Sequence, residues 1–416
     1  SNTAELLSAS LTDTDLGGGT FVLQGFYSRT SDVFGGGVFG TFQDPAIDPS
    51  GTLFDQSANR SRKLGGKVSY ERAVPGFDDL TLTAGFDALF DRTEQSLVQT
   101  DRVWVPRSDF RSLAPFLQGN LALADGVVRL AGGLRYENVE LSVDDFRTLA
   151  SYGAVEVEGG SPSFEDVLWN AGVIVEPVNG LRAYGSYAEG FTIADVGRIL
   201  RGITQPGVDV DDFLSLEPVV SNNRELGLEW NRGALQASAS YFWSSSDFGS
   251  LLVLRNDVFE VERQPIKIEG FEASVNWKTP VPGLSLSGGY ADLAGRTDGD
   301  GDGSVDEDLD GANISPDRIN LAADYATGPL SLSAQARFYL SREFNDAATA
   351  TDFEGYTLLD AFIAYRTDIG EFALAASNLT DEFYVTYDSD TVRVTDNSRF
   401  FSGRGRTFTL SWRGAF

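Results

Sequence analysis

Apolar and polar residues alternate strictly along several long segments of the chain. In Val128–Tyr136 the even positions are apolar or Gly, whereas the odd positions include two arginines. The same period of two runs through Leu235–Trp243, Leu330–Leu340 and Phe408–Phe416. This period predicts β-strands that have one apolar and one polar face. Runs of about ten residues exceed the usual strand of about 5–6 and match the roughly 9–11 that a tilted membrane strand needs.

The connections between these strands are of two kinds, which alternate. Short turn signals occur at 74–76, 124–126, 178–180, 231–233, 281–283, 327–328 and 368–370. Long polar segments lie between them, at about 33–60, 94–107, 142–163, 193–220, 297–315, 342–352 and 385–403. Outer-membrane β-barrels sort their connections in this way, with short periplasmic turns and long extracellular loops. The pattern therefore predicts an all-β fold, a transmembrane antiparallel β-barrel with about 17 strands visible, and a single domain over residues 1–416.

The period also assigns faces. We expect the even-numbered apolar residues Leu330, Leu332 and Phe338, with Leu235, Ala237 and Ala239, to face lipid. Gln236, Ser238, Gln335 and Arg337 then face the lumen. Aromatic residues mark both strand ends. They are Tyr70, Trp230, Trp277, Tyr325, Tyr365 and Trp412 before short turns or the C-terminus, and Tyr136, Tyr187, Trp243, Tyr290 and Tyr339 before long loops. Their lipid-facing members are expected to form two interfacial girdles.

Composition excludes several classes of function. The chain has no His and no Cys, which removes a Ser-His-Asp triad, a His-ligated metal or haem, and thiolate chemistry. No localised catalytic set remains, so we do not expect an enzyme. The net charge of −29 argues against nucleic-acid binding, because a phosphate backbone requires a basic face. No stretch of 18 apolar residues exists that could form a transmembrane helix.

One acidic loop has the spacing of a calcium site. Asp298, Asp300, Asp302, Ser304 and Asp306 occupy relative positions 1, 3, 5, 7 and 9, with Gly303 at position 6. A hard cation needs several oxygen ligands on a turn that Gly allows to close. Position 12 is Leu309 rather than the usual bidentate Glu. The sequence thus leaves two interpretations open, a weak Ca²⁺ site in an extracellular loop or a solvated acidic loop; no cofactor is otherwise required.

Five segments carry a resemblance to a known family. Tyr184–Phe191 is tyrosine-rich and ends in Glu-Gly-Phe, and Ala376–Tyr384 contains an Asn-Leu-x-Asp-x-x-Tyr motif. The others are Leu216–Pro218 with Ser221–Gly227, Ile268–Glu272, and Gly403–Thr407 before the closing strand to Phe416. In this order they resemble the barrel of TonB-dependent siderophore receptors of the bacterial outer membrane. Ala194 and Gly405 stand where that family usually has Pro.

The resemblance implies a receptor and uptake channel for a ferric siderophore or similar metal chelate. It also implies outer-membrane lipid or lipopolysaccharide around the barrel, and an inner-membrane energy-coupling protein that acts through an N-terminal plug segment. The family barrel has about 22 strands, so the resemblance implies that about five strands and the plug are missing here. A passive porin-like channel and a structural or adhesive outer-membrane barrel are the alternative functions.

Ligand contacts are expected from lumen or loop residues near the long-loop ends. Arginine pairs with the anionic groups of a chelate, and aromatic rings stack on its planar parts. The candidates are Arg135, Tyr187, Phe191, Arg198, Arg337 and Tyr339. Pairing with carboxylates of the protein itself is the alternative role for each arginine.

Overall fold

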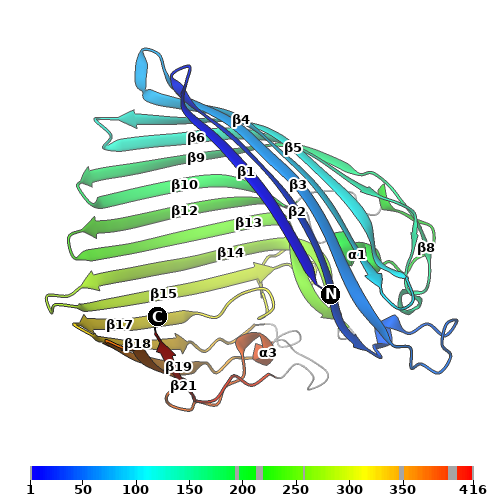
Figure 1. The fold of residues 1–416 in the computed structure, drawn as a ribbon. Coiled ribbons are helices and arrows are strands. Elements are labelled where there is room, and N and C mark those ends of the chain that lie inside the picture. Colours follow the sequence, from blue (N-terminus) through cyan, green and yellow to red (C-terminus); the bar gives the residue numbers. More distant parts are fainter. Residues whose placement is uncertain are drawn as a thin grey trace. The chain divides into compact units, whose positions relative to one another are not determined.

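The computed structural model describes residues 2–192, 196–211, 219–255, 258–345, 351–391 and 401–414. An 18-stranded antiparallel sheet occupies most of the chain (Figure 1). Its long strands are β1 (Thr3–Leu16), β2 (Gly19–Gly37), β3 (Asp55–Val74), β4 (Phe77–Leu97), β5 (Val103–Leu123), β6 (Val128–Val143), β9 (Ser163–Val178), β10 (Leu181–Thr192), β12 (Val219–Arg232), β13 (Leu235–Arg255), β14 (Val258–Lys278), β15 (Leu284–Thr297), β17 (Arg318–Thr327), β18 (Leu330–Tyr339), β19 (Tyr356–Thr367), β20 (Gly370–Ser377) and β21 (Thr407–Arg413). These are the 17 strands that the sequence predicts, and β16 (Glu307–Asp308) completes the sheet.

The chain divides into two compact units. The first unit comprises Ser1–Asp125, Arg129–Ala171 and Ala188–Val220, and the second comprises Gly126–Val128, Gly172–Tyr187 and Ser221–Phe416.

Short turns join consecutive strands where the sequence predicts them. Pro75-Gly76 lies between β3 and β4, and Gly328 lies between β17 and β18 with a positive φ of 53° that glycine adopts without strain. Gly17-Gly18 between β1 and β2 is a further short turn. The long-connection side differs from expectation at two places. The long connection expected at 94–107 is shorter, because β4 and β5 pair as far as Ser96↔Val103 and only residues 98–102 join them. In addition, β13 and β14 pair from Leu235↔Trp277 to Arg255↔Val258, so their ladder continues far beyond the length that a membrane requires.

The cross-strand registers confirm the predicted faces. Ala239 on β13 pairs with Leu228 and Ala273, whereas its neighbour Ser238 pairs with Glu229 and Ser274. Leu332 on β18 likewise pairs with Tyr325 and Ile363, whereas Gln335 pairs with Ala322 and Asp360. One face of the sheet, here called the apolar face, therefore collects Leu, Ala and Val side chains. The other, the polar face, collects Ser, Gln, Glu and Arg side chains.

Aromatic residues edge the apolar face at the short-turn end. Trp277 pairs with Leu235 and Leu286, and Tyr365 pairs with Leu330 and Phe372. Near the long connections, Trp243 and Tyr290 lie on this face too, in register with Glu269 and Ala273. Tyr339 is an exception, because it follows Arg337 on the polar face and pairs with Tyr356. Trp277, Tyr365, Trp243 and Tyr290 are thus on the face from which the girdles are expected, and Tyr339 is not.

The remaining elements are short and lie in the long connections. They are η1 (Gly40–Phe42), β7 (Phe146–Arg147), η2 (Ala150–Tyr152), β8 (Glu156–Glu158), α1 (Val196–Arg201), β11 (Val208–Asp209) and α3 (Tyr387–Thr391). In the first unit, β11, β8 and β7 form a three-stranded sheet. Leu200 of α1 and Val157 of β8 belong to a buried cluster there, which gives these loops a small core of their own. No described helix has the length and apolar character that would let it cross a membrane.

Candidate functional site: the polar face of β17–β19 and its loops

Three tyrosine rings pack in a row on the polar face of the second unit, each tilted against the next. Tyr339 ends β18 and pairs in register with Tyr356, which begins β19. Their ring centroids lie 4.5 Å apart, and the Tyr356 and Tyr384 centroids lie 4.4 Å apart. We call these three rings the tyrosine column. Phe353 packs edge-on against Tyr356 and holds the middle ring in place. Such rings offer flat faces that stack on planar ligand groups or bind cations.

Arg337 lies two residues before Tyr339 on β18 and therefore shares its face. Its Nη2 donates a hydrogen bond of 2.6 Å to Oδ2 of Asp360. The same carboxylate accepts the backbone N–H of Asn378 through Oδ1 at 2.8 Å. The Nε of Arg337 is buried and has no hydrogen-bond partner among the described residues. Arg337 thus has one protein carboxylate and an unused donor beside the tyrosine column.

The Asn-Leu-x-Asp-x-x-Tyr motif explains how Tyr384 reaches the column. Asn378 is 4% exposed and adopts a φ of 50°, a left-handed conformation that Asn tolerates. Its side chain donates to the carbonyls of Glu382 and Arg404 and accepts the N–H of Glu382. This closes the chain into a turn after β20. The Tyr384 ring then fills the space that a Cβ at Gly403 would need, so Gly403 permits the close approach.

Arg342 connects the neighbouring loops. Its Nη2 donates to the Leu293 carbonyl and, at 2.7 Å, to Oδ1 of Asp317. Nη1 lies 3.4 Å from the hydroxyl of Tyr387 in α3. Burial raises the pKa of Tyr387, although Arg342 opposes this by favouring the phenolate. Because the side chain of Arg342 is only 14% exposed, this arginine holds loops together rather than presenting itself to a ligand.

A second polar cluster lies in the first unit, around Arg135 of β6. Its guanidinium donates to Asp87 of β4 and to Glu137, which is 5% exposed. Ser112 also donates to Glu137, at 3.3 Å. Lys67 lies 4.9 Å from the centroid of the Phe116 ring. Lys67, Asp87, Ser112 and Arg135 line a groove of about 600 Å³ on the polar face.

The other three predicted ligand residues lie elsewhere. Tyr187 donates to Asn222 at 2.6 Å, and the Arg224 guanidinium lies over its ring. Gly185, two residues earlier on β10, faces the Leu226 side chain, which places Tyr187 on the apolar face. Phe191 stacks on Phe164 with centroids 5.5 Å apart. Arg198 lies half-buried in α1 of the first unit.

The acidic loop is closed by a short ladder. Thr297↔Glu307 and Arg296↔Asp308 pair β15 with β16, so residues 298–306 form the loop between them. Asp298, Asp300 and Asp302 each offer a carboxylate oxygen, and these three oxygens lie within 4.8 Å of one another. The Ser304 N–H donates to Asp302. Asp306 is not part of this cluster, and its carbonyl accepts from Asn345.

The loop also contains a carboxylate that sequence reasoning missed. Glu307 lies so close to Gly299 that a Cβ there would overlap its Oε2. Leu309 at position 12 is 3% exposed and packs with Ile314. Burial raises the pKa of Asp310, against the hydrogen bonds that it accepts from Ala312 and Asn313. Position 12 therefore anchors the loop in a small core, and Glu307 places a further carboxylate beside Gly299 of the loop.

Sequence reasoning also missed Tyr356, Tyr384 and Arg342. Tyr384 could have been found, because it ends the Asn-Leu-x-Asp-x-x-Tyr motif. Tyr356 and Arg342 had no distinguishing signal, since only the β18–β19 register and the loop packing bring them to Tyr339 and Tyr387. The segments 216–218 and 193–195, and Phe416, lie outside the described residues.

Comparison with known proteins agrees with this geometry. The family model described as "TonB dependent receptor-like, beta-barrel" matches residues 3–379. The ferric aerobactin receptor of Klebsiella pneumoniae is 26% identical over 338 residues, which cover 75% of this chain and 45% of that receptor. The ferric aerobactin receptor of Escherichia coli is 25% identical over 339 residues, with the same coverage. The chain thus spans somewhat less than half the length of the curated relatives it matches.

Solved structures show the same fold. The copper transporter OprC superposes with a TM-score of 0.76 at 17% identity, covering 97% of this chain and 64% of that protein. The ferric citrate transporter FecA in its unliganded form superposes with a TM-score of 0.71 at 17% identity, covering 98% of this chain and 61% of that protein. Because the family model covers most of the sequence, the identification does not depend on these distant structures. The chain belongs to the TonB-dependent receptor-like β-barrel family, whose members are outer-membrane receptors and transporters rather than enzymes.

Proposed function

We propose that this chain forms the barrel of an outer-membrane receptor that binds a ferric siderophore or a similar metal chelate for energy-coupled uptake. The observation that carries the proposal is the tyrosine column beside Arg337 on the polar face, in a chain of this family. The tyrosine column lies at the end of the polar face where the long connections begin. In an outer-membrane barrel these connections lie on the extracellular side. A chelate arriving from outside would meet these groups first.

The chemistry of the site fits a chelate that is both anionic and planar in part. The guanidinium of Arg337, whose side chain is 34% exposed, pairs with a carboxylate or hydroxamate oxygen of the chelate. The tyrosine column stacks on its flat or acyl portions. Similar proteins include a ferric aerobactin receptor and the ferric citrate transporter FecA, and citrate is a carboxylate ligand. We therefore favour a chelate with carboxylate groups.

Energy coupling completes the proposal. An inner-membrane coupling protein would act through a plug segment, as the family resemblance implies, and the barrel would supply the pathway. The test is uptake of ⁵⁵Fe-citrate by cells that lack other iron receptors, with and without a protonophore. Uptake that the protonophore abolishes is the expected result. Uptake that continues unchanged would favour the passive channel, and its absence with every carboxylate or hydroxamate chelate would overturn the receptor proposal.

We also propose that the 298–307 loop binds Ca²⁺ through Asp298, Asp300 and Asp302, with Glu307 as the further ligand. The β15–β16 ladder brings Glu307 beside Gly299, where it takes the role that Leu309 at position 12 does not fill. Ser304 and Asp306 lie farther along the loop and complete the sequence pattern. The solvated-loop alternative predicts no ion binding.

Isothermal calorimetry with Ca²⁺ up to millimolar concentration tests this second proposal. We expect saturable heat for the natural protein and for Glu343→Gln, a control that changes a loop carboxylate outside the cluster. The Asp300→Asn/Asp302→Asn variant should lose the heat, and Glu307→Gln should weaken binding by about tenfold. Saturable heat that survives in the double Asp variant would place the ion elsewhere.

A further inference from the structure

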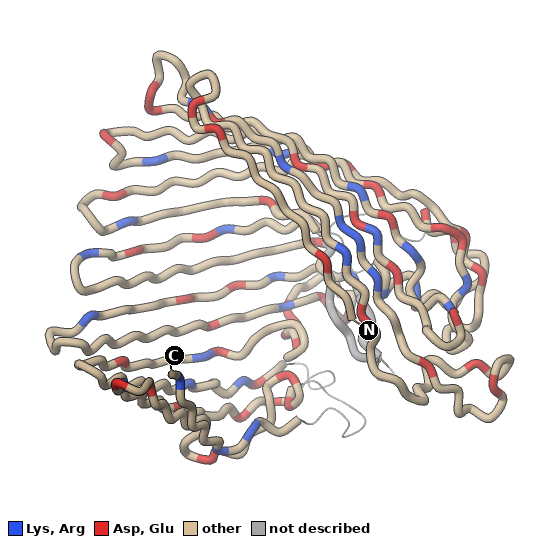
Figure 2. The backbone as a smooth tube through the Cα atoms, in the orientation of Figure 1, with Lys and Arg blue, Asp and Glu red and all other residues tan. Residues whose placement is uncertain are grey.

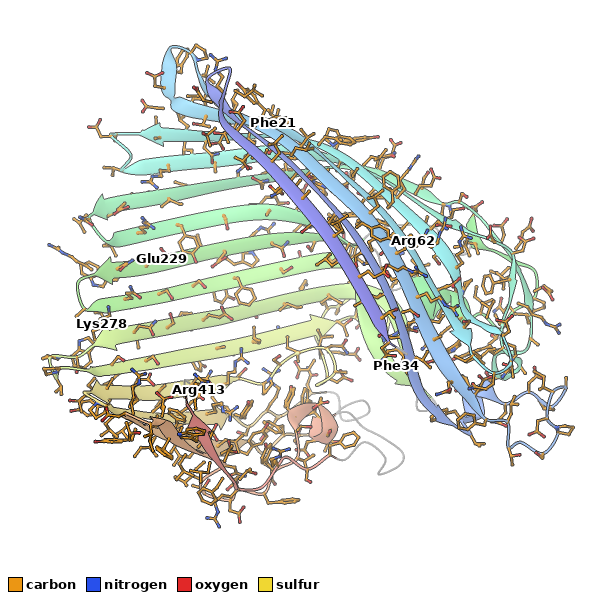
Figure 3. The ribbon with its side chains drawn as sticks, in the orientation of Figure 1. Phe21, Phe34, Arg62, Glu229, Lys278 and Arg413 are labelled. Atoms are coloured by element: carbon orange, nitrogen blue, oxygen red, sulfur yellow. The ribbon has the colours of Figure 1, made fainter. Side chains whose placement is uncertain are left out.

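Three arginines lie side by side on the apolar face of the first unit. Arg29 on β2 pairs directly with Arg62 on β3, and Arg62 pairs directly with Arg92 on β4. We call these residues the arginine row. Figure 2 shows the basic positions gathered on these neighbouring strands, and Figure 3 labels Arg62 among them. Like charges directly opposite each other in a sheet are destabilising, so the arrangement requires compensation.

The row lies on the side of the sheet that faces lipid. The next residues toward the short turns on this face are Tyr27, Leu64 and Phe90, which pair in the same register. Below them follow Leu23, Val68 and Phe86. Leu64 is 54% exposed and Phe90 is 45% exposed, as expected for side chains that contact lipid rather than a protein core. The arginine row therefore begins where the apolar band ends.

The height of the row matches a membrane interface. Arg62 and Arg72 lie on the same face of β3, Arg62 seven residues after its start and Arg72 two residues before its end. At about 3.3 Å per residue, their separation of ten positions spans about 33 Å along the strand. A strand tilt of about 40° reduces this to roughly 25 Å, the height of the lipid-facing band of an outer-membrane barrel. Arg72 marks the short-turn interface, and the arginine row marks the opposite, long-loop interface.

Protein carboxylates neutralise only part of this surface. Asp109 pairs with both Arg92 and Arg107, and Glu94 pairs with Arg60. Arg29 and Arg62 form no ion pair with any described residue, although Glu5 is the cross-strand neighbour of Arg29. Arg111, which pairs in register with Phe90, forms an ion pair with Glu140. Among the described residues the patch thus contains six arginines (Arg29, Arg60, Arg62, Arg92, Arg107 and Arg111) and four carboxylates (Glu5, Glu94, Asp109 and Glu140), for a net charge of +2. This is a basic patch on a chain whose net charge is −29.

From this arrangement we propose that Arg29 and Arg62 clamp a phosphate group on the headgroup of an outer-leaflet lipid. Guanidinium groups bind phosphate oxygens bidentately, and two facing arginines present parallel forks to one anion. The anion removes the repulsion between Arg29 and Arg62, while Leu64 and Phe90 contact the acyl chains below. The transported chelate is a poor candidate for this patch, because it is proposed to enter along the opposite, polar face.

The experiment measures lipid retention by the protein purified from outer membranes in mild detergent. Native mass spectrometry quantifies bound diphosphoryl lipid A for the natural protein, for Arg29→Gln/Arg62→Gln and for Arg72→Gln. Arg72 is the matched control, because it lies on the same strand and face at the other interface. We expect the double variant to retain about tenfold less lipid and Arg72→Gln to retain the natural amount. Arg29→Lys/Arg62→Lys should fall between them, since charge remains while the bidentate geometry is lost.

Two further arms identify the source of the phosphate. Lipid A without its phosphates should bind the natural protein weakly. Its retention should be no higher than the retention of diphosphoryl lipid A by the double variant. Inorganic phosphate in large excess should not displace the lipid, because free phosphate makes no contact with Leu64 and Phe90. Resistance of each variant to SDS unfolding without heating shows that the barrel is folded. Equal lipid retention by the folded double variant, equal retention of the stripped lipid, or displacement by free phosphate would each overturn the proposal.

Discussion

Arg135 in the first unit and Arg337 in the second are both arginines on the polar face, but protein carboxylates neutralise them to different degrees. Arg135 is held by Asp87 and by the almost completely buried Glu137. Arg337 has Asp360 alone and keeps a buried Nε without a partner among the described residues. An arginine paired with two carboxylates stabilises the wall of the barrel, whereas a partly exposed arginine that is paired with one carboxylate beside aromatic rings is available to a ligand.

The largest effect is expected for Arg135→Leu. Removing the cation leaves Asp87 and Glu137 unpaired on the polar face. We expect the free energy of unfolding to fall by about 2–3 kcal/mol, below the ~3–5 kcal/mol of a buried pair because Arg135 is one-third exposed. Urea unfolding in detergent micelles, followed by tryptophan fluorescence, measures this. A loss below about 0.5 kcal/mol would remove the structural role assigned to Arg135.

Arg337→Gln should instead weaken ligand binding. We expect the Kd for a carboxylate ferric chelate to rise about tenfold, the equivalent of a charged hydrogen bond of ~1.5 kcal/mol. Stability should change little, because Asp360 still accepts the Asn378 N–H. Fluorescence quenching titrations measure the Kd, and Arg366→Gln near a short turn is the control. A larger rise in Kd for Arg135→Leu than for Arg337→Gln, measured on equal amounts of folded protein, would show that Arg135 rather than Arg337 binds the chelate.

A smaller effect is expected from the middle ring of the tyrosine column. Tyr356→Leu removes the ring that contacts both Tyr339 and Tyr384. We expect the Kd to rise about three- to tenfold, in line with ~0.5–1.5 kcal/mol for an aromatic contact. Tyr356→Phe retains the ring and should bind within about twofold of the natural protein. A large loss in the Phe variant would show that the hydroxyl, rather than stacking, contributes the affinity.

The smallest effect concerns the loop that packs against α3 in the second unit. Burial raises the pKa of Asp310, so the folded loop binds a proton more tightly than the unfolded loop. The stability of the loop should therefore be highest below the ordinary carboxyl pKa of 3.8 and should fall as the pH rises toward the folded-state value. Hydrogen exchange at the Ala312 and Ile314 amides between pH 3 and 6, referenced to intrinsic rates, measures this. Asp310→Asn should abolish the pH dependence of loop stability. If the pH dependence persists in that variant, another titrating group causes it.

The sequence could predict the strands but only part of the site. The period of two assigned Ala239 to the apolar face and Ser238 to the polar face, because side-chain direction in a strand depends only on position. Tyr187 and Tyr339 were both predicted as ligand residues, because each is an aromatic residue at the end of a strand before a long loop. The structure places them on opposite faces of the sheet. Aromatic residues occur both in lipid-facing girdles and in ligand sites, and only register distinguishes them.

The sequence by itself determined the fold class, the 17 long strands, the short turns and the acidic loop, because these follow from local periodicity and turn chemistry. Tertiary structure alone decided which side chains meet. The Arg29–Arg62–Arg92 row, the Arg135 cluster and the tyrosine column each join residues from two or more strands or loops. Such contacts depend on cross-strand register and on where a loop returns, which the pattern within any single segment does not contain.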